Sequence, residues 1–324
     1  MGRREGNQGI NNIMDLFKGV AYALVTGLMW GWVFVVPVML PGYAPATLAF
    51  GRYCAFGLVA VALGLVDGER LLALRAADWR EAFKLALVGN IIYYLCLAAS
   101  IQISGVPLAS VLIGTLPVVI ALCANWQERS VPWAALLPSL ALMATGIACV
   151  NQSELALIAP DQGVHYLAGA LLALCAVAAW TWYPIRNASW LKRHPELSTT
   201  TWTTAQGLAT LPLAALGWIL FGAWQGQDLW SLGPQPWRFL ALMLSMGLFA
   251  SWLGTLAWSR AGRLLPSALA GQLIVFETLA ALAYGYFYRG RWPDALSLVG
   301  IALLVAGVVL GVRRFQRHTA APIH

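Results

Sequence analysis

Apolar residues in this chain fall into long unbroken runs that short polar connections separate. Ten such runs can be drawn, at roughly 19–40, 45–66, 83–103, 106–125, 132–150, 165–185, 199–221, 238–258, 265–287 and 295–312. Each has about 18 to 23 residues, the length that a helix needs to cross a hydrocarbon core of ~30 Å. The runs are continuous rather than alternating, so they predict membrane-spanning helices and not barrel strands. The least marked division lies around Gly105-Val106-Pro107, between the third and fourth runs.

Composition supports this interpretation. Of the 324 residues, 60% are hydrophobic and only 10% are charged, whereas a soluble domain has about 25% charged residues. No connection between the runs is long enough to form a soluble domain. We therefore expect an all-α polytopic membrane protein with ten transmembrane helices.

The basic residues predict the orientation of these helices, because cytoplasmic loops carry an excess of Lys and Arg. If the N-terminus is cytoplasmic, 16 of the 20 Lys and Arg residues lie at cytoplasmic ends of the spans. Only Arg238, Arg289 and Arg291 lie on the other side, and Arg52 lies within a span. Both termini are therefore expected in the cytoplasm. The net charge of +7 reflects this asymmetry and does not indicate nucleic-acid binding.

Internal repetition divides the chain into two halves. Leu97-Ala98-x-Ser100 recurs as Leu256-Ala257-x-Ser259 at an offset of 159 residues, and Trp30 and Trp32 recur as Trp180 and Trp182 at an offset of 150. We predict a first five-helix repeat over 1–155 and a second over 156–324. Because five is odd, the second copy enters the membrane upside-down. Such inverted repeats place a binding site near the midplane, between the halves.

Ten spans, a five-plus-five repeat, cytoplasmic termini, an Arg in the second span and short connections together resemble the drug/metabolite transporter superfamily. Within that superfamily the chain is most similar to the ten-helix EamA-type exporters, and among these to the exporters of aromatic amino acids. The resemblance covers roughly 15–315. It implies an alternating-access carrier of small metabolites in a bacterial inner membrane.

Two charged residues lie well inside the spans. Glu277, in the run Leu-Ile-Val-Phe-Glu-Thr-Leu, is ~18 Å along the ninth span, and Arg52 is ~10 Å below the outer end of the second. A charge at such depth is costly and is usually paired or functional. Two interpretations stay open: an ion pair between the two residues, and a Glu277 that faces a cavity and binds a substrate amine or a proton.

Aromatic and polar neutral residues within the spans complete the candidate substrate-binding set. Indole and phenol groups need hydrogen-bond partners, which lipid does not supply. The candidates besides Glu277 and Arg52 are Trp30, Trp32, Tyr93, Tyr94, Asn90, Trp180, Trp182, Ser251 and Gln272. Trp30 and Trp32 are ~200° apart on a helix, so both cannot face one cavity. Core packing is the alternative role for each aromatic residue.

The expected function is export of small neutral metabolites, chiefly amino acids with aromatic or hydrophobic ones preferred, with membrane lipid as surroundings and a proton as a possible coupling ion. Export of lipophilic organic cations is the alternative. All four histidines lie at span ends or in tails, and no nucleotide-binding glycine pattern occurs. We therefore expect no enzymatic activity, no metal and no cofactor.

Overall fold

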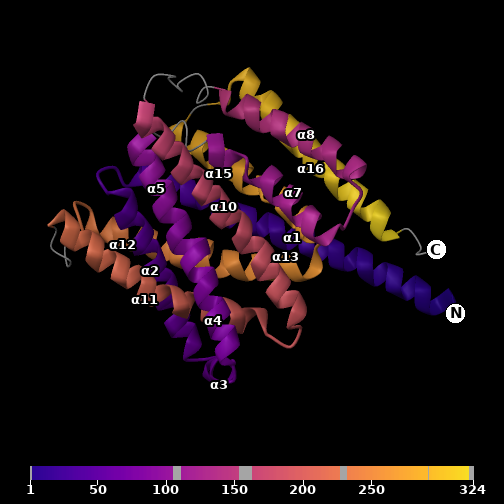
Figure 1. Cartoon of the computed structure of the whole chain (residues 1–324), viewed down its shortest axis with the longest axis horizontal. Helices are drawn as coiled ribbons and strands as arrows, with labels where there is room; N and C mark the ends of the chain where they lie inside the picture. The colour runs from indigo at the N-terminus through magenta and orange to yellow at the C-terminus, as the bar shows by residue number, and fades with distance from the viewer. Residues whose placement is uncertain (1, 105–110, 153–162, 227–231, 291, 321–324) are drawn as a thin grey trace.

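The computed structural model describes residues 2–104, 111–152, 163–226, 232–290 and 292–320, and these residues form helices joined by short connections (Figure 1). The elements are α1 (Gly2–Met39), α2 (Pro45–Gly64), α3 (Gly68–Leu72), α4 (Ala76–Leu85), η1 (Ala86–Ile92), α5 (Tyr93–Ser104), α7 (Leu116–Glu128), α8 (Trp133–Val150), α10 (Gly163–Arg193), α11 (Thr199–Gln225), α12 (Pro236–Ser245), η2 (Met246–Leu253), α13 (Gly254–Leu264), α14 (Ser267–Leu273), α15 (Val275–Arg289) and α16 (Ala295–Ala320). Here η denotes a π-helix.

These helices make ten transmembrane spans in two inverted repeats of five. Nine stretches of the described chain are long and apolar enough to cross a membrane, from Met14–Met39 to Ala295–Gln316. The fourth span is not among them because it is interrupted at Thr115, just before α7. Its predicted boundary with the third span, around Gly105, and the predicted junction of the two halves at residue 155 both lie outside the described residues.

Irregular backbone recurs at matching places in the two halves. The third span changes from α- to π-helix over η1, and the eighth does so over η2, which begins 160 residues later. The fourth span is interrupted at Thr115 and the ninth at Ile274, 159 residues later. The offsets agree with those of the sequence repeat, so the repeat extends to departures from regular helix.

Each span packs most extensively on a span from the other half of the chain. Helix α8 packs on α16, α2 on α11, α7 on α14, α5 on α10, and α1 on both α13 and α15. Figure 1 shows α8 beside α16 and α2 beside α11, with both chain ends at the same end of the molecule. Three of these pairs are a span and its own repeat mate, as expected of two copies related by a twofold axis.

The packing of α1 on α15 depends on glycine. A Cβ at Gly31 would lie 2.8 Å from the backbone nitrogen of Ala281, and a Cβ at Gly27 would lie 3.0 Å from that of Glu277. Small residues let two membrane helices approach backbone to backbone. This contact holds the first turn of α15, and with it Glu277, against α1.

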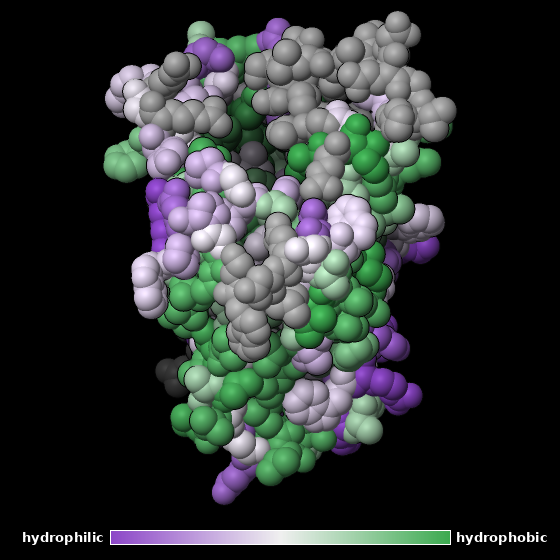
Figure 2. Space-filling model, turned by 90° about the vertical axis from the view of Figure 1, so that its left-hand side faces the viewer, coloured by the Kyte–Doolittle hydropathy of each residue, from purple (hydrophilic) through white to green (hydrophobic). Residues whose placement is uncertain are grey.

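The outer surface of the helices is apolar. Large hydrophobic side chains such as Phe17, Leu58 and Leu167 are more than half exposed. In Figure 2 green apolar side chains cover much of the face in view, with purple polar groups mostly toward its margins. Such a surface is stable in a bilayer, where apolar exposure has no hydration cost.

Candidate functional site

Arg52 of α2 is buried inside the molecule, with 9% of its surface exposed. Its Nε donates a hydrogen bond to Ser251 Oγ of η2, at 3.1 Å. Its guanidinium carbon lies 5.1 Å from the ring centre of Tyr53, within the range of a cation–π interaction. Its terminal guanidinium nitrogens make no hydrogen bond to another residue of the described chain. Arg52 can therefore donate to a further group.

Glu277 lies in the first turn of α15, directly after the interruption at Ile274, and its N–H donates to Ile274 O at 2.9 Å. The residue is partly exposed, and its carboxylate bonds to no side chain among the described residues. The positive end of the α15 dipole favours a carboxylate here. The charges of Arg52 and Glu277 attract each other, but no ion pair within 4.0 Å joins them in the described chain.

Four aromatic rings connect the elements around these charges. The ring centres of Trp30 (α1) and Trp180 (α10) are 5.5 Å apart, Trp30 and Trp258 (α13) are 5.4 Å apart, and Trp180 and Tyr93 (α5) are stacked at 4.7 Å. Trp30 and Trp180 are repeat mates, so the two halves present the same residue to each other at their common axis.

The two π-helices supply polar partners to this cluster. Ala250 O of η2 accepts a hydrogen bond from Trp30 Nε1 at 2.9 Å, and the next residue, Ser251, holds Arg52. In η1, Asn90 Nδ2 donates to Thr210 Oγ1 at 3.0 Å. A π-helical turn changes the directions of side chains and carbonyls, and such turns are frequent at functional sites. The matched π-helices therefore shape the space between the halves.

The structure brings together most of the predicted site residues. Tyr94 joins them because its ring meets Tyr53 edge-on, with 6.4 Å between the ring centres. Arg52, Glu277, Trp30, Trp180, Tyr93, Tyr94, Asn90 and Ser251 all lie on helices that meet between the two halves. We call these eight residues and Tyr53 the interface site.

Three predicted residues lie elsewhere. Trp32 donates to Ser245 Oγ at 3.2 Å and packs near Tyr284. Its repeat mate Trp182 packs against an apolar cluster that includes Trp202. Gln272 is fully buried, its amide bonds to no described group, and it packs against Gly311 of α16. The separation of Trp30 from Trp32 agrees with their opposite directions on one helix.

Sequence reasoning missed three contributors. Tyr53 lies under the Arg52 guanidinium, and its place beside Arg52 in the sequence was the available signal. Trp258 extends the ring cluster, and the available signal was an indole at the end of an apolar run, at 238–258. Tyr183 stacks on Trp180 at 5.2 Å and donates from its hydroxyl to Gln206 Oε1 at 3.0 Å. Its spacing of three residues from Trp180 places both on one helix face.

Comparison with known proteins assigns the family. Residues 17–152 match the EamA-like transporter family, and residues 167–313 match it a second time. The chain belongs to the EamA-like transporter family. The double match agrees with the internal repeat, and membership makes this chain a membrane transporter and not an enzyme.

Relatives of this EamA-like transporter include inner membrane protein YtfF of Escherichia coli, which is 43% identical over 92% of this chain and 96% of that protein. A probable terminal-alkyne amino-acid exporter of Streptantibioticus cattleyicolor is 26% identical over 93% of this chain and 95% of its own length. A protein of known crystal structure, 18% identical, matches with a TM-score of 0.69 over 90% of this chain and 95% of its own. That last likeness shows the fold alone.

Proposed function

We propose that this transporter exports small neutral amino acids, with aromatic or hydrophobic ones preferred, across the bacterial inner membrane by alternating access. Both termini are cytoplasmic in this proposal, and the two five-helix repeats are residues 1–155 and 156–324. Its main support is a pair of opposite charges, Arg52 and Glu277, that both lie within the spans and form no ion pair with each other in the described chain. A zwitterionic amino acid carries the complementary pair of charges on adjacent groups.

In this proposal Arg52 binds the substrate carboxylate. Arginine presents its N–H donors in a planar fork that matches a carboxylate. Only Nε is bonded to a described residue, and Ser251 fixes the orientation of the guanidinium through that bond. The terminal nitrogens therefore remain for the substrate.

In the same proposal Glu277 binds either the substrate ammonium group or a coupling proton. The interruption at Ile274 frees the start of α15 from the ideal helix ladder, and discontinuous helices of this kind line binding sites in other transporters. The stacked rings of Trp180, Tyr93 and Trp30 give the apolar wall that an aromatic or hydrophobic side chain would contact. An amino-acid exporter among the relatives lends this assignment further support.

A second candidate is export of lipophilic organic cations. A single carboxylate near aromatic rings suits such a substrate, and Arg52 would then make no contact with it. The two candidates differ in their need for Arg52.

The test is uptake into proteoliposomes containing wild type, Arg52→Gln or Glu277→Gln, with phenylalanine and an aromatic organic cation as separate substrates. Loss of one charge-assisted contact costs about 1.5–3 kcal/mol, or roughly 10- to 100-fold in transport. Under the amino-acid proposal both variants lose phenylalanine transport by that factor. Retained cation transport in Arg52→Gln, with no phenylalanine transport by wild type, would favour the cation exporter.

A purely structural role for the charges predicts a different result. In that case Glu277→Gln destabilises the fold by leaving a buried arginine uncompensated, and adding Arg52→Gln restores part of the stability. Glu69→Gln, on the exposed face of α3 and without a side-chain bond to a described residue, is the matched control. Normal phenylalanine transport by Glu277→Gln would contradict the proposed role of Glu277.

A further inference from the structure

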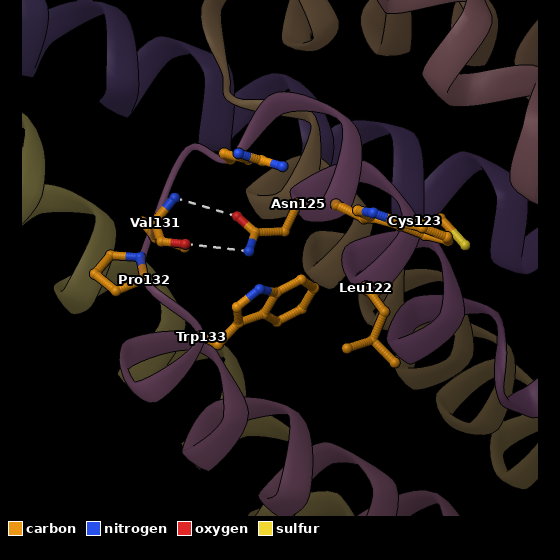
Figure 3. A pocket seen from close by; sticks show the side chains of 8 residues that line it. Leu122, Cys123, Asn125, Val131, Pro132 and Trp133 are labelled. Carbon is orange, nitrogen blue, oxygen red and sulfur yellow. Dashed lines mark hydrogen bonds between the residues drawn. The ribbon is translucent and has the colours of Figure 1, made fainter.

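A hollow of about 700 Å³ lies at the loop between α7 and α8, and none of its lining residues belongs to the interface site. It is lined by Leu122, Cys123, Asn125, Trp126, Arg129, Val131, Pro132 and Trp133. Figure 3 shows Leu122 of α7 and Trp133 of α8 beside the same space, with Asn125 bonded to Val131 above them in the view. The hollow is therefore a feature of one helical hairpin.

The lining changes from charged to apolar along the helix axis. Arg129 lies at the loop end, and Leu122 and Cys123 precede it by six or seven residues, or ~10 Å of helix. Trp126 and Trp133 flank the loop and are 74% and 44% exposed. Indole rings favour the level of the lipid headgroups. The hollow thus has a charged end at headgroup level and an apolar end directed toward the membrane interior.

The backbone of Arg129 indicates that its side chain has a role. Its φ is +47°, and it is the only residue other than glycine with positive φ in the described chain. Helices α11 and α15 end in the same left-handed conformation, but with Gly226 and Gly290. Glycine adopts this conformation without the steric cost that a side chain brings. Arg129 therefore adopts this conformation against the local preference for glycine.

The Arg129 guanidinium bonds to no other residue that the structure describes. Its neighbour Glu128 does not neutralise it, since that carboxylate already accepts bonds from Ser267 and Lys192. Asn125 is 1% exposed and fixes the loop by bonding both the N–H and the carbonyl of Val131, each at 3.1 Å. A free cation is thus held on a rigid loop at the mouth of the hollow.

We propose that this hollow binds one phospholipid with an anionic headgroup. The phosphate contacts the Arg129 guanidinium between the two indoles, and one acyl chain lies along Leu122 and Cys123. The order of charged and apolar groups in the lipid matches the order along the hollow, which a free inorganic anion would leave half empty. This site is independent of the transported substrate.

The experiment measures phosphatidylglycerol bound to the purified full-length protein by native mass spectrometry, and the shift in melting temperature that this lipid causes. Arg129→Gly removes the cation and relieves the left-handed backbone. We expect about tenfold weaker phosphatidylglycerol binding, together with an unchanged or higher melting temperature without lipid. Arg129→Lys keeps the charge and should retain most of the binding.

Arg314→Gln removes an exposed arginine of α16 that also bonds to no other described side chain, and it is the matched control for net charge. Loss of phosphatidylglycerol in Arg129→Gly, with binding kept in Arg129→Lys and Arg314→Gln, supports the proposal. Wild-type binding by Arg129→Gly would overturn it. So would equal binding of phosphatidylcholine, or an equal melting shift with inorganic phosphate alone, which would identify a simple anion site.

Discussion

Trp180 packs against several other rings and also keeps some exposed ring surface. It stacks on Tyr93 at 4.7 Å and on Tyr183 at 5.2 Å, and it also meets its repeat mate Trp30. Despite these contacts it remains partly exposed. Trp180 thus keeps some accessible ring surface that a substrate could contact, whereas Trp30 is buried and bonded to Ala250 O.

This difference gives a prediction for a matched pair of substitutions. Trp180→Phe keeps an aromatic ring but removes the larger indole surface, and we expect the apparent affinity for an aromatic substrate to fall several-fold. Trp182→Phe, two residues away and outside the interface site, should change the apparent affinity for the same substrate less than about twofold. Transport at varied substrate concentration measures both, with melting temperature as the folding control. Equal effects of the two variants would contradict a contact between Trp180 and substrate.

Asp294, in the loop before α16, gives a pH prediction outside the membrane. Its carboxylate accepts a 2.6 Å hydrogen bond from the Ser297 N–H. The backbone and side-chain hydrogen bonds of Ser297 lower the pKa of Asp294 below its usual value because they favour the ionised form. A lowered pKa in the folded state adds stability above the unfolded pKa of about 3.9, which is lost as the pH falls through the folded value.

Asp294→Ala should therefore lower the melting temperature at pH 7, and the difference from wild type should shrink below about pH 4. Thermal unfolding in detergent across this pH range measures it. Asp294→Asn keeps a capping side chain, so its melting temperature at pH 7 should lie between those of wild type and Asp294→Ala. A difference that is constant with pH would show that the charge of Asp294 does not contribute.

At the residue scale, the sequence indicates which charged side chains are unusual, but it does not predict which residues they contact. Arg52 and Glu277 could be found because a charge within an apolar run is unusual, whatever surrounds it. The bond from Arg52 to Ser251 depends on the packing of α2 against η2, and the place of Gln272 depends on Gly311 of α16. Such contacts join residues far apart in the chain, and composition or spacing within one span does not determine them.

At the scale of elements, Glu128 links three helices. It ends α7, and its carboxylate accepts bonds from Ser267 N at 2.9 Å and Ser267 Oγ at 2.5 Å, at the start of α14. Lys192 of α10 donates to the same carboxylate at 3.1 Å. A side chain from the first half thus caps a helix of the second half, where unpaired N–H groups and the helix dipole favour an anion.

Glu128→Ala should lower the free energy of unfolding by about 1–2 kcal/mol, the usual cost of removing a helix cap. The partly exposed Lys192 contact adds little to this. Denaturation in detergent is the measurement, and Glu69→Ala on α3 is a control without such contacts. Equal stability of the two variants would show that water replaces the cap.

The span positions follow from the sequence, but the irregular backbone within them does not. Hydropathy is the same whether Ala86–Ile92 and Met246–Leu253 are α- or π-helical. The interruption at Ile274 also lacks a local proline or glycine at the break itself, although Gly271 precedes it by one turn. Tertiary packing decides these features, and they are the ones that shape the interface site.

At the scale of the whole molecule, the orientation is the prediction with the most direct test. Single cysteines at Leu72 and Gln225, in a chain whose five native cysteines are replaced, should react with a membrane-impermeant maleimide on opposite sides. We expect labelling of Gln225→Cys in intact cells and of Leu72→Cys only after lysis. The reverse pattern would mean that the termini face the periplasm and that the orientation predicted from the Lys and Arg residues is wrong.

The exchange of packing partners between the halves has a consequence for how the protein is assembled. Helix α2 packs on α11 and α8 on α16, so corresponding helices of the two halves meet as they do in the isologous interface of a homodimer. The chain therefore resembles two subunits of an intertwined homodimer that are joined covalently. Each hydrophobic cluster of the described residues draws side chains from both halves, 1–155 and 156–324. Each half should therefore be degraded when expressed alone and recovered when both are co-expressed. For the same reason, any body that moves during transport must combine helices from both copies, and cannot be one copy acting as a unit.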